Sequence, residues 1–255
     1  MKKEMLDNVG ETFELIQGYR DKDGIIHKEF EVREMNGSDE EAISKKEIKI
    51  NGAKILRTLI ARCCNRIGNY YKDEMKESKW IEIIQSLSVG DQDYIILKIR
   101  EASLGGEIEG SYKCPHPECN TDILTTVDTE ELEIVPFDGL FEIPFELPNG
   151  HKDKDGNILK KGKLRHPNGL DREVLDNISK KNIGLANTLM LSRCVIELEG
   201  IKVYDDLIRG LSVKDRKYLM NLFKEHKFGV NLEVEVECPN CFETFKASLN
   251  AVNFI

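Results

Sequence analysis

The sequence lacks a long apolar run, a recognisable secretion signal and an excess of positive charge. Because a bilayer-spanning helix needs about 20 consecutive apolar residues, no membrane span is expected. The first residues, Met1-Lys2-Lys3, lead into charged residues rather than an apolar stretch, so no signal peptide is expected either. Seven cysteines in a chain without such a signal indicate a reducing compartment, where thiols are available to a metal.

The charge balance argues against nucleic acid as a partner. The chain has 37 lysines and arginines against 46 aspartates and glutamates, a net charge of −9. Nucleic-acid affinity depends mainly on basic side chains that neutralise phosphates, so an acidic chain gains little from this attraction. Nucleic acid is therefore not an expected partner.

Familiar catalytic and nucleotide-binding motifs are also missing. The sequence contains no Gly-x-Ser-x-Gly, no Walker loop, no His-Glu-x-x-His and no dinucleotide fingerprint. Its five histidines are scattered through polar surroundings: His27, His116, His151, His166 and His226. The sequence therefore predicts a protein that is not an enzyme and has no catalytic residues.

Two short cysteine turns are the most specific feature of the chain. They are Cys114-Pro-His-Pro-Glu-Cys119 and Cys238-Pro-Asn-Cys241. Alternating segments predict strands on either side of both turns: Glu107 to Lys113, Ile123 to Val127, Asn231 to Glu237 and Thr244 to Leu249. A turn between two strands that holds two cysteines is half of a zinc ribbon, and four thiolates complete the tetrahedral shell that zinc prefers. The prediction is one structural Zn²⁺ held by these ligands: Cys114, Cys119, Cys238 and Cys241.

Other roles for the cysteines remain open. Disulfides would use the same thiols but are disfavoured in a reducing compartment. A redox pair at Cys238 and Cys241 would need a helix after the pair, whereas Phe-Glu-Thr-Phe-Lys alternates like a strand. His116 is interpreted as a spacer within the first turn rather than as a ligand. Cys63 and Cys194 are interpreted as buried apolar side chains.

The two turns belong to a longer internal repeat. Phe13 to Gly37 and Phe145 to Gly169 align at a constant offset of 132 residues, with 13 identities in 25 positions. Two further matches continue the alignment at offsets of 131 and 124: Arg62-Cys63 with Arg193-Cys194, and Leu87-Ser88-Val89 with Leu211-Ser212-Val213. Cys114 matches Cys238 at the same offset of 124. The sequence therefore predicts a tandem duplication.

The repeat predicts an α+β fold of two related lobes. Each lobe is expected to contain an N-terminal β-hairpin, a helical middle and a C-terminal zinc-knuckle hairpin. The chain then divides into a lead-in at 1–12, lobe 1 at 13–134, a connector at 135–144 and lobe 2 at 145–255. If each lobe supplies half of one metal site, the lobes should meet around a pseudo-twofold axis near the zinc.

Local patterns in lobe 1 predict where its helices lie. Ser38, followed by acidic residues, is expected to be an N-cap. Apolar residues at helical spacing predict a helix from Gly52 to Ile67, and the polar stretch from Asn69 to Lys79 predicts a surface loop. The N-terminal hairpin of each lobe is expected to have a free strand edge to which a partner could add a strand.

Several of these segments resemble one known protein family. The matching segments are Val32-Arg-Glu-Met-Asn-Gly-Ser-Asp-Glu-Glu41, Leu59-Ile-Ala-Arg-Cys63, and Leu87-Ser-Val-Gly-Asp-Gln-Asp93 followed by a Cys-Pro knuckle. They are similar to baseplate hub proteins and hub assembly factors of contractile-tailed bacteriophages and of related contractile injection systems. The resemblance covers most of residues 13–134 and, through the repeat, 145–255. Lobe 2 departs from it at Leu164-Arg-His-Pro167.

The resemblance implies a structural or interaction protein of the central baseplate, or an assembly chaperone of its hub. Its partners would be other tail and baseplate proteins, with several copies in a symmetric assembly as one arrangement. It would act in the host cytoplasm during assembly and, as a permanent component, in the virion tail. The alternative is a zinc-ribbon nucleic-acid-binding protein, whose best basic segment, His151 to Lys163, is interrupted by acids.

Overall fold

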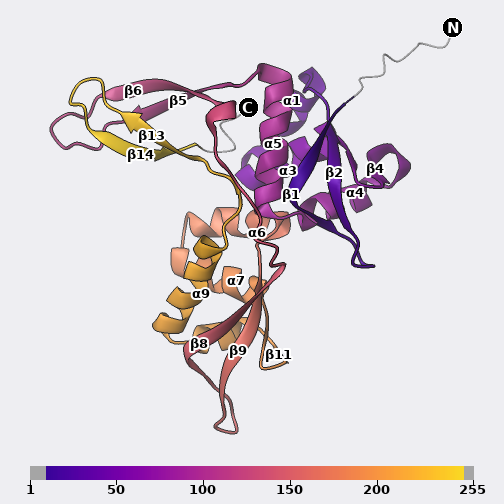
Figure 1. The fold of residues 1–255 in the computed structure, drawn as a ribbon, viewed down its shortest axis with the longest axis vertical. Helices are drawn as coiled ribbons and strands as arrows, with labels where there is room; N and C mark the ends of the chain where they lie inside the picture. Colours follow the sequence, from indigo (N-terminus) through magenta and orange to yellow (C-terminus); the bar gives the residue numbers. More distant parts are fainter. Residues whose placement is uncertain (1–9, 250–255) are drawn as a thin grey trace.

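The computed structural model describes residues 10–249; residues 1–9 and 250–255 lie outside the described part. Most of the expected lead-in at 1–12 and the last residues of the expected lobe 2 therefore lie outside it. Helices and antiparallel strands are mixed along the chain, as expected for an α+β protein. Figure 1 shows two helix-containing bodies, one above the other, and two hairpins that extend together to one side. Between residues 10 and 249 no helix is both long enough and apolar enough to cross a bilayer.

The first half of the chain forms a four-stranded sheet, in the order β1-β2-β3-β4, covered by helices. Its elements are β1 (Glu11–Arg20), β2 (Ile26–Val32), α1 (Gly37–Ile43), α2 (Lys46–Lys49), α3 (Gly52–Cys63), β3 (Cys64–Ile67), β4 (Tyr70–Tyr71), the 3-10 helix η1 (Lys72–Glu74), α4 (Glu77–Ser86) and α5 (Val89–Leu104). Buried side chains of α3, α4 and α5, including Trp80, pack with Phe30 of β2 in one core.

The second half forms a body with the same kind of layering. Its sheet has the order β11-β10-β9-β8. Its elements are β8 (Glu142–Lys152), β9 (Ile158–Arg165), α6 (Gly169–Ser179), α7 (Ile183–Cys194), β10 (Val195–Leu198), β11 (Ile201–Lys202), α8 (Asp205–Gly210) and α9 (Val213–Glu225). A separate core joins Leu164 of β9 to Leu191 and Leu219 of the helices.

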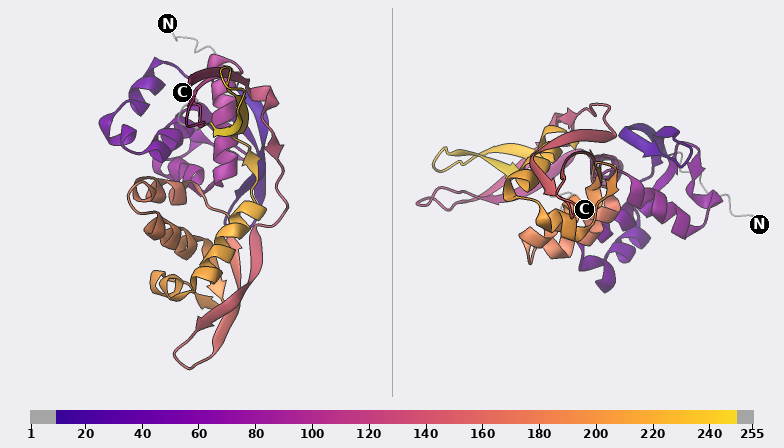
Figure 2. Two further views of the ribbon diagram at one scale, coloured as in Figure 1. Left: turned by 90° about the vertical axis from the view of Figure 1, so that its left-hand side faces the viewer. Right: turned by 90° about the horizontal axis from the view of Figure 1, so that it is seen from below.

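Two hairpins form what we call the arm, residues 107–128 and 233–248. It consists of β5 (Glu107–Lys113) with β6 (Asp122–Asp128), and β13 (Glu233–Glu237) with β14 (Thr244–Ser248). The 3-10 helix η2 (Thr129–Glu131) follows β6. Two short strands, β7 (Ile134–Val135) and β12 (Gly229–Val230), pair antiparallel at the base of the arm. The second view in Figure 2 shows both hairpins leaving the body on the same side.

Several local expectations need correction. The expected helix from Gly52 to Ile67 ends at Cys63, because Cys64–Ile67 pairs with β2 as strand β3. The expected loop from Asn69 to Lys79 contains β4, η1 and the start of α4. The N-cap of α1 is Asn36, not Ser38. Residues 142–144 of the expected connector belong to β8.

The first hairpin of each half contains the same irregularity. The register shifts between Glu14 and Tyr19 in β1 and between Glu146 and His151 in β8. Gly18 and Gly150 have φ of 96° and 86° at these bulges, a conformation that glycine adopts without a Cβ clash. Both bulges bring backbone N–H groups of the edge strand toward a buried aspartate.

These aspartates bind the edge strands and the serines that cap two helices. Asp91 accepts hydrogen bonds from the backbone N–H groups of residues 16, 17 and 18 at 2.7, 3.0 and 3.1 Å. Asp215 accepts one from the N–H of Asn149 at 2.8 Å. Ser88 and Ser212 are the N-caps of α5 and α9: each hydroxyl accepts from the backbone N–H of the aspartate three residues later and donates to its carboxylate. Backbone N–H groups on part of each edge strand are therefore already hydrogen-bonded within the chain, and those groups are not free to pair with a partner strand.

A second buried aspartate in each half binds two arginines. Asp39 accepts from Arg33 at 2.8 Å and from Arg62 at 2.7 Å. At the corresponding place in the second half, Asp171 accepts from Arg165 at 2.7 Å and from Arg193 at 2.6 Å. Both aspartates are fully buried. Each cluster ties the end of the second hairpin strand to two helices of its half, α1 and α3 in the first half and α6 and α7 in the second.

The two halves meet through faces that do not correspond. Helix α6 packs against α3 and α4. Arg172 of α6 forms an ion pair with Asp93 at 2.7 Å, and Glu173 accepts from Gln85 at 2.9 Å. In the described residues no comparable contact joins α1 to α7 or α8. The expectation of a pseudo-twofold contact between the lobes is therefore wrong for the two bodies.

Gly169, the first residue of α6, lies in this contact against Gln92, and replacing it should weaken the packing of the two halves. A Cβ on Gly169 would overlap the amide nitrogen of Gln92, whose side chain is buried and donates to Ile84. We expect Gly169→Ala to lower the free energy of unfolding by about 1–3 kcal/mol. The matched control is Gly37→Ala in α1, where nothing lies within 4 Å. Equal effects in urea denaturation would contradict this account.

Candidate metal centre

The arm is held together by a small core of its own. Ile123 of β6 packs with Val236 and Ala247 of the second hairpin. The hairpins are in regular register, with Glu107 opposite Asp128 and Glu233 opposite Ser248 at their bases. Both cysteine turns then lie at the outer ends of the hairpins, where the strands bring them together.

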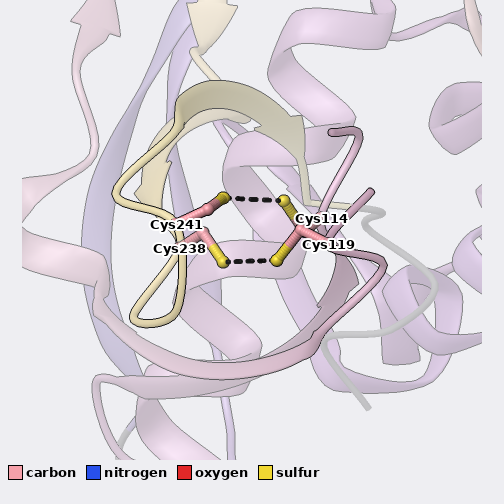
Figure 3. A group of neighbouring side chains, drawn as sticks. All are labelled: Cys114, Cys119, Cys238 and Cys241. Carbon is pink, nitrogen blue, oxygen red and sulfur yellow. Dashed lines mark hydrogen bonds between the residues drawn. The ribbon is translucent and has the colours of Figure 1, made fainter. Parts of the chain in front are cut away.

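The four predicted cysteines meet at this end of the arm. The Sγ atoms of Cys114 and Cys241 are 3.6 Å apart, and those of Cys119 and Cys238 are 3.7 Å apart. All four Sγ atoms lie within 4.8 Å of one another. Figure 3 shows the four side chains pointing inward, two from each hairpin. Each close pair contains one cysteine from each hairpin. Cys114 and Cys238 are the first cysteines of their turns and Cys119 and Cys241 the second, so each pair joins a first cysteine to a second one.

Backbone geometry shapes both turns in the same way. The residue after the second cysteine has positive φ in each, 48° at Asn120 and 61° at Phe242. The N–H of Cys114 donates to the carbonyl of Thr121, and that of Cys238 donates to Glu243, both at 2.9 Å. A non-glycine residue in this region is strained, and such strain is frequent where a tight turn presents functional side chains.

The electrostatic surroundings of the thiols differ. The pKa of Cys119 is lowered to about 6, mainly because its sulfur interacts with the Thr121 hydroxyl and the Asn240 side-chain amide. The backbone N–H of Glu243 lowers the pKa of Cys241, but burial and the neighbouring thiols outweigh it and raise this pKa to about 12. Burial raises the pKa of Cys114. Four thiols so close together cannot all lose their protons unless a cation balances the charge.

The other interpretations of these residues fit the geometry less well. The sulfur distances far exceed the roughly 2.05 Å of a disulfide, and all seven cysteines are free. Cys238 and Cys241 lie between two strands, not at a helix N-terminus where a thioredoxin-like pair would be activated. His116 lies in the first turn, where Nδ1 faces the N–H of Glu118 at 3.4 Å, and it is not part of the cluster.

The remaining cysteines are buried away from this cluster. Burial raises the pKa values of Cys63, Cys64 and Cys194 to about 12. Cys63 and Cys194 end α3 and α7, in the apolar positions expected from the sequence. These three thiols are therefore weak nucleophiles in the folded protein.

A difference in thiol reactivity follows. In protein treated with a chelator and iodoacetamide at pH 7.5, we expect the four cysteines of the arm to be modified first: Cys114, Cys119, Cys238 and Cys241. Metal removal frees these thiols, whereas the other three stay buried in the folded bodies with raised pKa values. Peptide mass spectrometry should find Cys63, Cys64 and Cys194 unmodified until the protein unfolds. Rapid modification of these buried cysteines in folded protein would contradict the assignment.

Sequence reasoning missed the supporting groups around the cluster and the two aspartate–arginine clusters. Thr121 and Asn240 contact Cys119, although only their positions beside the cysteines hinted at such a role. Asp39 was interpreted only as an acid in the first turn of a helix, and no role was predicted for Asp171. The signal that could have identified them is the repetition of Arg, Asp and Arg at offsets of 132, 132 and 131.

Fold and site together define a class: an α+β protein whose described residues contain one cluster of metal-type side chains, a closed set of four thiols. Comparison with family models is more specific. The model described as T4 bacteriophage base plate protein matches residues 25–253. The chain therefore belongs to this family of phage baseplate proteins, which confirms the baseplate part of the resemblance found in the sequence. Searches of curated proteins and of solved structures gave no match.

Proposed function

We propose that this chain is a non-catalytic structural protein of a contractile tail baseplate, acting at the hub or in hub assembly. Membership of the baseplate family is the observation that carries the role. The two cysteine turns lie more than a hundred residues apart in the sequence. One metal site shared by both turns would close this long loop and link the two halves of the chain. Its partners would be other tail and baseplate proteins.

The four cysteines are proposed to hold a structural Zn²⁺. Four sulfurs at about 2.3 Å from a tetrahedral zinc lie about 3.8 Å from one another, close to the 3.6 and 3.7 Å of the two short pairs. A set of four protein ligands leaves no position for substrate or water, which is typical of structural rather than catalytic zinc. Bound Zn²⁺ would stabilise all four thiolates.

We further propose that the two halves arose by tandem duplication, with lobe 1 at 13–134 and lobe 2 at 145–255. The support is repetition of specific contacts: the bulge glycines Gly18 and Gly150, the aspartate–arginine clusters, and the Ser–Asp caps. Each half also contributes one hairpin with one cysteine turn. The common ancestor would then have carried half a site.

The alternative of a zinc-ribbon nucleic-acid-binding protein is not favoured by the arm. Residues 107–128 and 233–248 contain nine acidic residues and only two lysines. The outward faces of the strands expose several of these acids, among them Glu107, Glu233 and Glu235. Phosphate would be repelled from this surface. Salt-sensitive binding of duplex or single-stranded DNA would revive the alternative.

Metal analysis tests the proposed site. Purified protein should contain one zinc per chain by inductively coupled plasma mass spectrometry. Two per chain, or none after purification without chelator, would contradict a site shared between the halves.

The baseplate role is tested in producing cells. A tagged chain should co-purify with baseplate proteins, and gradient fractionation should show whether it stays in finished tails or leaves after assembly. Normal assembly of tails in cells that lack this chain would contradict the proposed role.

A further inference from the structure

The contact between the two halves leaves two matching faces uncovered. We call Asn51, Arg57, Gln85 and Asp93 the receiving face of the first half, because α6 of the second half packs there. Under the proposed duplication, α6 corresponds to α1, and the receiving face corresponds to Asn182, Arg209 and Lys217. Thr188 stands at the place of Arg57, but it is buried within its own half, where Arg216 donates to its hydroxyl. The contact within the chain uses α6 of the second half and the receiving face of the first half. Helix α1 and the receiving face of the second half therefore remain unused.

Solvent exposure separates the used faces from the unused ones. Asn51 is buried beneath α6 and donates to the carbonyl of Glu173 at 2.9 Å, whereas its counterpart Asn182 is exposed. Gly169 is buried against Gln92, whereas its counterpart Gly37 is exposed. The second receiving face also exposes apolar side chains, with Ile183 66% and Val213 82% exposed.

The charges on the unused faces are complementary. In the used contact, Arg172 of α6 binds Asp93 of the receiving face at 2.7 and 2.8 Å. The counterparts are Glu40 of α1 and Lys217 of α9, so both signs are reversed and the pair still attracts. Both side chains are exposed, and neither forms an ion pair within residues 10–249. Glu41 would similarly meet Arg209, which now pairs only with exposed acids of α8.

We propose that a second copy of this chain docks α1 onto the exposed receiving face formed by α7, α8 and the start of α9. This contact would repeat between chains the contact that α6 makes within the chain. It rests on the duplication in the proposed function and extends it by naming a partner and both surfaces. Because the contact is head to tail, it generates a ring if the rotation closes and a filament if it does not.

Light scattering coupled to size-exclusion chromatography tests the proposal with full-length, zinc-loaded protein. The mass should rise above the 29.2 kDa of one chain as concentration increases. Glu40→Lys and Lys217→Glu should each weaken association by at least about tenfold, since each places like charges together. Mixing the two variants should restore association, because the introduced lysine of one variant then meets the introduced glutamate of the other.

A steric variant and separate readouts keep the test decisive. Gly37→Gln should block association while leaving the thermal unfolding midpoint unchanged, because Gly37 has no neighbour within 4 Å in the single chain. A chain that stays at the mass of one copy at all concentrations, or association unaffected by Glu40→Lys, would overturn the proposal. Zinc content and co-purification with tail proteins are measured independently, so a monomer with one zinc would sink this inference alone.

Discussion

Cys238→Ser is expected to lose zinc and to unfold the arm while the two bodies stay folded. The arm core contains few buried apolar side chains, and an isolated two-stranded hairpin is at most marginally stable. Structural zinc contributes about 10–16 kcal/mol of binding free energy in small zinc-binding peptides, far more than such a core supplies. Hydrogen exchange should show lost protection in β5, β6, β13 and β14, with protection kept in α3 and α7.

Cysteines outside the cluster provide the control. Cys194→Ala removes a buried thiol from the core of the second body, so it should cost some stability but leave one zinc per chain. A chelator should reproduce the effect of Cys238→Ser in wild-type protein. If the arm kept its protection after metal removal, the small apolar core would have to suffice, and the structural role of the metal would be wrong.

Asp171→Asn is expected to cost about 3–5 kcal/mol of unfolding free energy, because it leaves Arg165 and Arg193 without their buried counter-charge. Asp39→Asn should have a similar effect in the first half, where Arg33 and Arg62 lose theirs. Denaturant titration followed by circular dichroism measures both. An exposed acid such as Asp206, which also pairs with an arginine, is the control and should cost less than about 1 kcal/mol when changed to Asn.

The same clusters predict the sign of the pH dependence. Burial alone would raise the pKa values of Asp39 and Asp171, but hydrogen bonds from the arginines hold both pKa values below the usual range. A lowered folded-state pKa stabilises the protein above the unfolded-state value of about 4, and this stabilisation is lost as pH falls further. Stability should therefore drop below about pH 4, and the drop should shrink in Asp171→Asn and in Asp39→Asn. An unchanged acid profile in these variants would contradict this account.

The arm shows how far sequence patterns can reach. The alternation around both turns predicted β5, β6, β13 and β14 close to their observed bounds, because a strand exposed on one face repeats every two residues. The spacing of the cysteines within each turn is also a local feature, so it could be read directly from the sequence. The matched turns also predicted one shared site, and in the structure the arm core and the pairing of β7 with β12 hold the two hairpins together.

Helix ends show where local patterns fail. Cys64 and Ile67 continue the apolar spacing of α3, yet they pair with β2 and form β3 instead. A short apolar segment fits either a helix face or a buried strand, and only the neighbouring strand decides between them. The choice of Asn36 over Ser38 as N-cap is similar, because either side chain can accept from the first turn.

The sequence by itself determined the family, the internal repeat, the mixed α and β character and the four cysteines. These features depend on residue identity and short-range spacing, both of which can be read from the sequence alone. The tertiary structure alone decided that the two bodies pack head to tail, through faces that do not correspond, although the two cysteine turns meet as the repeat predicts. It also decided that two aspartates are buried between arginines. Such arrangements depend on contacts between residues far apart in the chain, whose energies no local pattern encodes.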